Sequence, residues 1–320
     1  MVTIPAVTEQ TEAFVGLIHV GPSQSHLADA IEALDSLFHY EAGIKGVIAI
    51  NDATDPQRLQ GLEQRYSGKL TSVPCPWHSQ WSDGIWGRSC SRNLLGLRRA
   101  YEQYRPFSFL LKLDTDALVI APFSANITRF FRQHPEVGLA GTYRLTPQGE
   151  VRQAPKWSNL ITAYANRIRF RDLKKNHLSL LYFLTHRREF RRMSTVIQTA
   201  IANGYVPSEH CQGGSYAVAY PVIEQLYQQG ELNHPEQWLY VNMGEDLLLA
   251  IYARYLGYQL ADFNRAGEPF GVDYHGLPFT PTELVTRGYA IIHSTNTDPT
   301  LSQAEISAFF RDRRTQPMLK

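Results

Sequence analysis

The chain has 320 residues, of which 43% are hydrophobic and 19% are charged. This composition can form a sizeable core and excludes a mainly disordered protein. The formal net charge of +1 excludes a protein whose whole surface binds nucleic acid or another polyanion. The length suggests about two domains, or one large α/β unit.

The cysteines and the apolar runs indicate the compartment. Cys75, Cys90 and Cys211 are too few, and odd in number, for a disulfide framework, which fits a reducing environment. The N-terminal sequence does not read as a signal peptide. No run of about 18 apolar residues predicts a transmembrane helix. We therefore expect a cytoplasmic protein, with any membrane contact confined to its surface.

Short apolar runs alternate with segments of helical periodicity through the first half of the chain. The run 14–20 (FVGLIHV) predicts a strand that ends at Gly21-Pro22, and 107–113 (FSFLLKL) is the strongest strand signal. Strands are expected at 14–20, 46–50, 70–73, 107–113 and 137–143, and helices at 25–40, 56–66 and 91–104. This alternation predicts an α/β fold with a mostly parallel central sheet and helices on both faces.

Two carboxylates, Asp114 and Asp116, follow the strongest strand directly. In parallel α/β sheets, ligands bind beyond the carboxyl ends of the strands. Residues two apart on extended chain lie about 7 Å apart on one side, and two carboxylates there repel by roughly 2 kcal/mol at a dielectric near 20. Bound Mg²⁺ or Mn²⁺ would reverse this interaction and also hold a diphosphate. The alternative is a solvated turn, since Asp-x-Asp is a common tripeptide.

The segment 111–116 (LKLDTD) resembles the DxD segment of GT-A fold glycosyltransferases, and four other segments resemble further motifs of that family in the family's order. These are Asn51-Asp52 after the second strand, 91–97 (SRNLLGL), 212–218 (QGGSYAV) and 244–249 (GEDLLL). The segments lie within residues 14–298, most of the chain. Each motif is weak alone, and the ordered set is more specific.

The resemblance implies a nucleotide-sugar donor, with a UDP-linked sugar as the first expectation. Asp52 would contact the base or the ribose, Arg92 the diphosphate, and Asn93 would anchor the adjoining loop. Gly213 and Gly214 would let the backbone approach a ligand closely. The alternatives are an Asx turn at Asp52, an exposed arginine at a helix start, and a bulge or turn at the two glycines.

The resemblance also implies the catalytic base and the third metal ligand. Asp246 would take the proton from an acceptor hydroxyl, while Glu245 would either replace it as the base or orient the acceptor. Both carboxylates could instead cap the helix that follows them. His293, after an apolar segment, would complete a manganese or magnesium shell with Asp114 and Asp116. Its alternative is a partly buried histidine bonded to backbone.

Several other side chains are lesser candidates. His210 and His275 are further possible metal ligands. The stretch 74–88 holds three of the five tryptophans, which could stack on a base or sugar, or pack beneath the loop. Cys75, His78 and Cys90 match no standard zinc spacing and lack a fourth ligand.

A basic segment at 167–192 holds nine Lys or Arg and two acids, a net charge of +7, which leaves −6 for the remainder. It also carries an apolar run at 178–184. Three interpretations stay open: a solvated helical face, a surface for anionic lipid or a lipid-phosphate acceptor, and a site for an acidic glycan. No aromatic-basic module accompanies the charge, so nucleic acid is not an expected partner.

The sequence therefore predicts a metal-dependent glycosyltransferase that moves a sugar to a glycan, lipid-linked or small hydroxyl acceptor with inversion. The alternatives are a binding protein of the same fold without catalysis, and a nucleotidyltransferase, which would need a Gly-rich basic loop that 21–26 lacks. The expected divisions are a tail at 1–12, a domain at 13–310 and a tail at 311–320. Within the domain we expect a donor-binding half at 13–145, a basic helical insertion at 150–205 and an acceptor half at 206–298.

Overall fold

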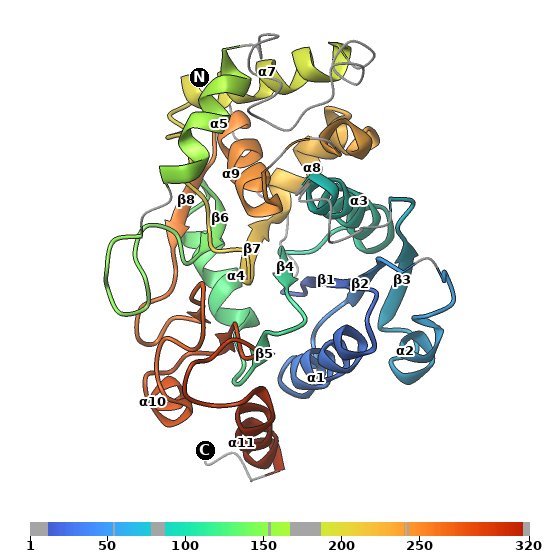
Figure 1. Ribbon diagram of the computed structural model, residues 1–320, viewed down its shortest axis with the longest axis vertical. Helices are drawn as coiled ribbons and strands as arrows, with labels where there is room; N and C mark the ends of the chain where they lie inside the picture. Colours follow the sequence, from blue (N-terminus) through green and yellow to red (C-terminus); the bar gives the residue numbers. More distant parts are fainter. Residues whose placement is uncertain are drawn as a thin grey trace.

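The computed structural model describes residues 12–53, 55–77, 87–152, 155–166, 187–239, 241 and 243–315 (Figure 1). Its centre is a seven-stranded sheet. In spatial order the strands are β3 (Leu70–Pro74), β2 (Gly46–Asn51), β1 (Val15–Val20), β4 (Phe109–Leu113), β7 (Ser215–Ala219), β6 (Val137–Gly141) and β8 (Gln259–Asp262). Only β7 runs antiparallel to its neighbours in this sheet. The predicted mostly parallel sheet is confirmed.

Helices cover both faces of this sheet. The α-helices are α1 (Gln24–Tyr40), α2 (Gln60–Arg65), α3 (Gly87–Tyr104), α4 (Ser124–Gln133), α5 (Pro155–Ala165), α7 (Arg187–Ala202), α8 (Tyr220–Gln228), α9 (Glu245–Tyr255), α10 (Pro281–Thr286) and α11 (Gln303–Thr315). Figure 1 shows α1 and α4 on one side of the sheet and α3 and α9 on the other. On the α3 side, Gly96 lies so close to Leu17 of β1 that an added Cβ would be 2.4 Å from its methyl carbon.

A small second sheet joins distant parts of the chain. It contains β5 (Leu118–Val119), β10 (Ile291–Ile292) and β9 (Phe270–Gly271). Strand β5 follows the DxD segment directly, and β10 pairs antiparallel with it. This pairing brings the end of the domain back to the end of β4.

The expected elements are found, with shifted ends. Ser23 caps α1 and forms a capping box with His26. Helix α3 begins at Gly87, one turn before the predicted start at 91, and α2 begins at Gln60 because 56–59 form a turn. The predicted strands 107–113 and 137–143 are shorter, at Phe109–Leu113 and Val137–Gly141.

The C-terminal region differs from the expected tail at 311–320. Helix α11 continues to Thr315, and both Arg311 and Arg314 form ion pairs with Glu32 of α1. The Arg314 side chain is only 10% exposed. These contacts dock 311–315 on the domain, which no local pattern in the sequence predicts.

Only the last part of the predicted basic segment is described. Residues 167–186 lie outside the described residues, as do 1–11 and 316–320. Within α7, Arg192 pairs with the buried Glu231 at 2.8 Å, so this cation belongs to the fold. Among the described helices, none is both long and apolar enough to cross a membrane.

The strand order reverses direction beside β1. Its neighbours β2 and β4 are reached by connections that run in opposite directions, and open α/β sheets bind ligands outside the carboxyl ends of strands at such a point. Asp52 follows β2 and Asp114 follows β4. The predicted donor residues therefore flank this switch point.

Candidate active site

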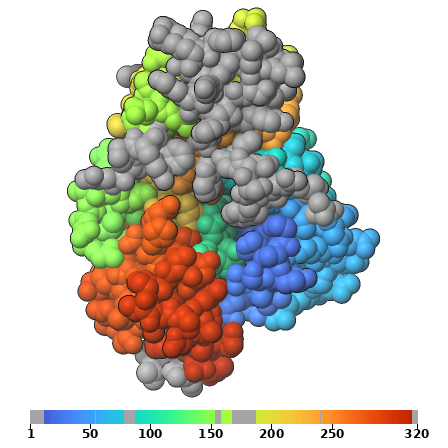
Figure 2. All heavy atoms as spheres, in the orientation of Figure 1, coloured from blue at the N-terminus to red at the C-terminus, as the bar shows by residue number. Residues whose placement is uncertain are grey.

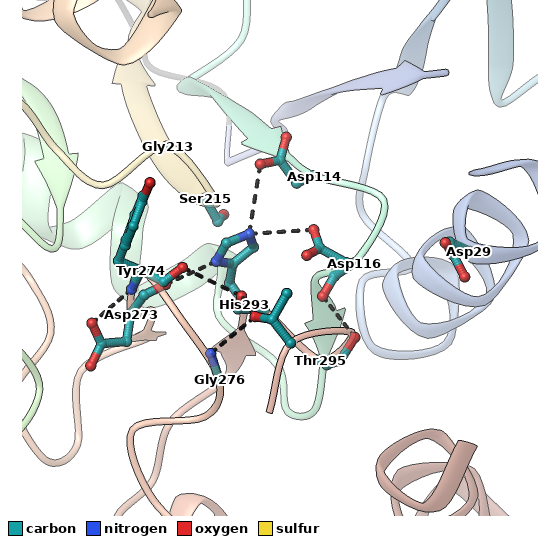
Figure 3. A network of polar contacts seen from close by, with 12 residues as sticks. Asp29, Asp114, Asp116, Gly213, Ser215, Asp273, Tyr274, Gly276, His293 and Thr295 are labelled. Atoms are coloured by element: carbon teal, nitrogen blue, oxygen red, sulfur yellow. Dashed lines mark hydrogen bonds and ion pairs between the residues drawn. The ribbon is translucent and has the colours of Figure 1, made fainter. Parts of the chain in front are cut away.

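Three side chains form a group that could hold a metal ion: Asp114, Asp116 and His293. Each offers one ligand atom, and these atoms all lie within 4.8 Å of one another. His293 Nε2 is 3.3 Å from Asp116 Oδ1 and 3.7 Å from Asp114 Oδ2. Figure 3 shows the imidazole reaching both carboxylates from its own loop. The structure thus brings together the three predicted ligands.

Backbone contacts hold His293 in this place. Thr295 donates to the Asp116 carbonyl through its N–H at 3.2 Å and through its Oγ1 at 2.9 Å. A Cβ on Gly214 would lie 2.0 Å from His293 Cγ, so only glycine fits there. In the structure, the group that lies close to the Gly214 backbone is the His293 imidazole.

The imidazole is oriented for ligation. His293 Nδ1 lies 3.0 Å from the carbonyl oxygen of Asp273 and donates to it, so Nε2 is the ring nitrogen that faces the carboxylates and would ligate a metal ion once it has lost its proton. Burial opposes protonation of His293, but the charges of Asp116 and Asp114 outweigh it and raise its pKa. Two carboxylates and one imidazole form a mixed set that suits Mn²⁺ or Mg²⁺.

A second carboxylate pair, Glu245 and Asp246, begins α9. Lys112 Nζ lies 3.2 Å from Glu245 Oε1. Burial alone would raise the pKa of Glu245, but the charge of Lys112 outweighs it and lowers this pKa to about 2. For Asp246, burial raises the pKa against the charge of His210. Asp246 is therefore the more basic carboxylate of the two.

The capping alternative also has support at this helix. Asp246 Oδ1 accepts from the backbone N–H of Leu247 at 2.8 Å, whereas Gly244 at the cap position has no side chain to accept. Asp246 Oδ2 remains on the other side, 3.6 Å from His210 Nε2. One carboxylate thus contacts the helix start through one oxygen and faces the site through the other.

The Gly213-Gly214 turn lies between the two carboxylate pairs. A Cβ on Gly213 would be 3.3 Å from Asp246 Oδ2, while one on Gly214 would meet the His293 ring. Two consecutive residues therefore touch the expected base and the metal group. The turn therefore links the two halves of the site.

His210 lies beside the expected base and outside the metal group. Its Nδ1 is 2.8 Å from the carbonyl of Ser208, a residue held at φ 84°, and its Nε2 is 3.2 Å from an amine nitrogen of Arg152. Since Nδ1 donates to Ser208, Nε2 accepts from Arg152. Arg152 also donates to the Gln212 side chain and to three backbone carbonyls, so it holds the segment around His210 in place.

Both Arg152 and His210 line a cavity of ≈ 360 Å³. Two of the exposed large hydrophobic side chains, Val151 and Val206, line it at 73% and 58% exposure. Its other lining residues are Tyr143, Arg144, Leu145, Ser208 and Glu209. The cavity is therefore partly apolar and adjoins the side chain that contacts Asp246.

Two residues that were predicted to contact the nucleotide-sugar donor, Asp52 and Arg92, form a pair with each other. Arg92 donates to Asp52 Oδ2 at 2.6 Å, with side chains 9% and 0% exposed. Asn93, on the next position of α3, donates to the Tyr216 hydroxyl at 3.5 Å, and its buried Oδ1 has no partner among the described residues. Asp52 and Arg92 thus form a buried pair beside the switch point, and their contact with a donor stays a prediction.

Sequence reasoning assigned no role to two buried polar residues, Lys112 and His19. Burial alone would lower the pKa of Lys112, but Asp114 and Glu245 outweigh it and raise it, so the side chain is an ammonium. Burial, with the charges of Arg92 and Lys112, lowers the pKa of His19 to about 3, so its imidazole is neutral. A lysine within the apolar run FLLKL was the available signal.

Other lesser candidates lie apart from the metal group. Cys75 Sγ donates to the Trp77 carbonyl and Cys90 Sγ to the Met243 carbonyl, so the two thiols serve separate backbone contacts. His275 does not belong to the metal group. The predicted aromatic loop falls mostly at 78–86, including His78, outside the described residues.

No protein-family model matches the sequence, and no curated protein matches it. Solved structures do match. Core-mannan synthase A (CmsA/Ktr4) from Aspergillus fumigatus, in an Mn/GDP form, is 13% identical with a TM-score of 0.46, over 81% of this chain and 74% of that chain. Mannosyltransferase PcManGT from Pyrobaculum calidifontis, in complex with GDP-Man and Mn²⁺, is 12% identical with a TM-score of 0.40, over 81% and 56%.

TarS from S. aureus is 17% identical with a TM-score of 0.32, over 45% of this chain and 23% of that chain. This chain thus spans less than two thirds of TarS and of PcManGT. All three likenesses are remote, so a function for this chain depends on the residues of its own site.

Proposed function

We propose that the protein is a metal-dependent glycosyltransferase that uses a nucleotide-sugar donor. One observation carries the proposal: the Gly213-Gly214 turn sets Asp246 and the Asp114–Asp116–His293 group side by side at the carboxyl end of β4. A metal-competent group beside a carboxylate of raised pKa can serve both partners of a sugar transfer, the departing diphosphate and the attacking hydroxyl.

Asp114, Asp116 and His293 would hold Mn²⁺ or Mg²⁺. When bound, the ion supplies charge that stabilises the diphosphate as it leaves. The protein's own contribution is the proton transfer. As the acceptor oxygen forms its bond to the anomeric carbon and the bond from that carbon to the diphosphate breaks, Asp246 accepts the hydroxyl proton. A single displacement of this kind inverts the anomeric centre.

The assignment of the base follows from the different surroundings of the two carboxylates. Glu245 is matched by the Lys112 ammonium at 3.2 Å, which makes it a weak base. Asp246 faces no lysine or arginine within salt-bridge distance among the described residues, and its side chain is 19% exposed. We therefore assign proton acceptance to Asp246 and an orienting role to Glu245.

The sites of donor and acceptor follow from the same arrangement. We place the donor at the switch point, near Asp52 and Arg92, with a UDP-linked sugar as the first choice. We place the hydroxyl acceptor in the cavity beside His210, on the Asp246 side. A cytoplasmic location and a contact between 167–192 and an anionic membrane surface stay proposals from the sequence.

The proposal is tested with a panel of UDP- and GDP-linked sugars, each with and without Mn²⁺. A donor at about a hundred times its dissociation constant stabilises the protein by roughly 2.7 kcal/mol, which a thermal-shift assay detects. The stabilising donor is then assayed for transfer to simple glycosides. Stabilisation without transfer or hydrolysis would instead indicate a binding protein of this fold.

Asp116→Ala supplies the matching variant. We expect it to lose Mn²⁺ binding and Mn²⁺-stimulated turnover, by about 10³-fold, while it stays folded. Asp29→Asn is the control. Asp29, a residue of α1, lies on the Asp116 side of the site (Figure 3), but it accepts a hydrogen bond from Gln303 and does not belong to the metal group. Unchanged turnover in Asp116→Ala would overturn the metal-dependent mechanism.

A further inference from the structure

Lys112 carries a fully buried positive charge near the site. Its side chain is 1% exposed within β4, where every residue is buried. An ammonium in such a place is strongly destabilising unless several acceptors compensate it. Its contacts therefore show which parts of the structure depend on this charge.

Three acceptors from three separate segments surround the ammonium. Lys112 Nζ lies 2.5 Å from Asp114 Oδ1 and 3.2 Å from Glu245 Oε1, and it also donates to the carbonyl of Gly213. The ring of Tyr216 lies 5.7 Å away. The segments are the end of β4, the start of α9 and the turn before β7.

Each of these segments carries part of the site. Asp114 belongs to the metal group, Glu245 precedes the base Asp246, and Gly213 lies against Asp246 Oδ2. One ammonium therefore contacts the donor side and the base side at once. The sheet register reinforces the link, since Ser215 donates to the Lys112 carbonyl at 2.9 Å and Asp114 donates to the Gly214 carbonyl at 3.0 Å.

We propose that Lys112 is a positioning residue that holds the metal carboxylate Asp114 and the base Asp246 in fixed relative places for sugar transfer. This inference rests on the proposed function. Lys112 touches neither reacting partner; it acts through Asp114, Glu245 and Gly213. A displacement of about 1 Å between reacting groups can reduce a rate about 10²-fold. A rigid link between the metal group and the base can therefore offset the destabilisation that comes with a buried ammonium.

Lys112→Met, which keeps the length of the side chain, tests the proposal. We expect kcat for transfer to fall roughly 10²-fold, with the donor KM within about threefold of wild type and Mn²⁺ binding to the apo protein retained. The fold also loses stability, because Glu245 is left without its cation. A loss of Mn²⁺ binding like that of Asp116→Ala would show that Lys112 serves the metal group alone.

The double variant Lys112→Met/Glu245→Gln separates positioning from stability. Removing both charges of a buried pair costs less than removing one, so Tm should recover. We expect kcat to stay low. Recovery of both Tm and kcat would overturn the proposal, since Lys112 would then be needed only for folding.

A control and a structural readout complete the experiment. Lys45→Met is the matched control, because Lys45 donates to the carbonyls of Tyr104 and Pro106 and contacts no site residue; kcat should not change. Crystal structures of wild type and Lys112→Met compare the placement of Gly213 and Asp246 relative to Asp114. Unchanged placement would overturn the inference even if wild type transferred no sugar, an outcome that separately defeats the proposed function.

Discussion

Two pairs of carboxylates lie at different ends of secondary-structure elements and have matching but distinct partners. Asp114 and Asp116 follow a strand, and Glu245 and Asp246 begin a helix. In each pair the first member contacts the Lys112 ammonium, at 2.5 Å and 3.2 Å. The second members face histidines instead, Asp116 at 3.3 Å from His293 and Asp246 at 3.6 Å from His210.

The comparison shows how surroundings separate chemically identical groups. The His293 hydrogen bond and charge outweigh burial and lower the pKa of Asp116, as suits a ligand that must stay ionised. Burial raises the pKa of Asp246, as suits a group that must accept a proton. Three predictions test this difference between a metal pair and a base pair.

The largest effect is expected at the base pair. Asp246→Asn should keep donor and Mn²⁺ binding and lose transfer by about 10²–10⁴-fold, since the amide cannot accept the proton. Glu245→Gln should reduce transfer by less, about tenfold, and should lower unfolding stability by roughly 3 kcal/mol because Lys112 loses a partner. Transfer rates of both variants test the expected losses of activity, and chemical denaturation tests the expected loss of unfolding stability. A larger rate loss in Glu245→Gln would exchange the two roles.

The metal pair should respond to pH. Burial raises the pKa of Asp114 to about 6, against the charges of Lys112 and His293, and the carboxylates raise the pKa of His293. A proton and a cation compete for these atoms, so Mn²⁺ affinity should begin to fall as pH drops through the raised pKa of His293, and should fall more steeply below about 6, where Asp114 also takes a proton. The fall should approach tenfold per pH unit for each proton displaced. Titration calorimetry in buffers of different ionisation enthalpy measures the released protons. Affinity independent of pH between 5 and 7 would contradict this account.

The smallest effect is expected at the cavity beside the base. Val206→Trp should fill part of it and raise the acceptor KM roughly tenfold, or about 1.4 kcal/mol, with the donor KM unchanged. Ile201→Trp is the control, since Ile201 is 38% exposed and does not line the cavity. Steady-state kinetics with each substrate varied in turn make the measurement. An unchanged acceptor KM would move the acceptor site elsewhere.

Local patterns in the sequence determined five strands of the central sheet, the helices α1, α2, α3 and α9, and the two carboxylate pairs. Period-two and period-3.6 apolar spacing depends on neighbours within about 18 residues, which is why β1, β2, β4 and α1 are found where they are expected. The same patterns place Asp114 and Asp116 at a strand end. The shape of the site is determined at longer range.

Only the tertiary structure decided which partners these residues meet. Thr295, which fixes the His293 loop, bonds Asp116 across 179 positions of sequence, and Lys112 meets Gly213 across 101. Arg92, which the sequence predicts to contact the diphosphate, pairs with Asp52. Arg314, which lies in a predicted tail, docks the last helix on α1, and Figure 2 shows the C-terminal part of the chain against the N-terminal part. Apolar periodicity records which face of an element is buried. It does not record which buried face another element will cover. That choice determined that His293 meets Asp114 and Asp116, and that Lys112 lies between Asp114 and Glu245.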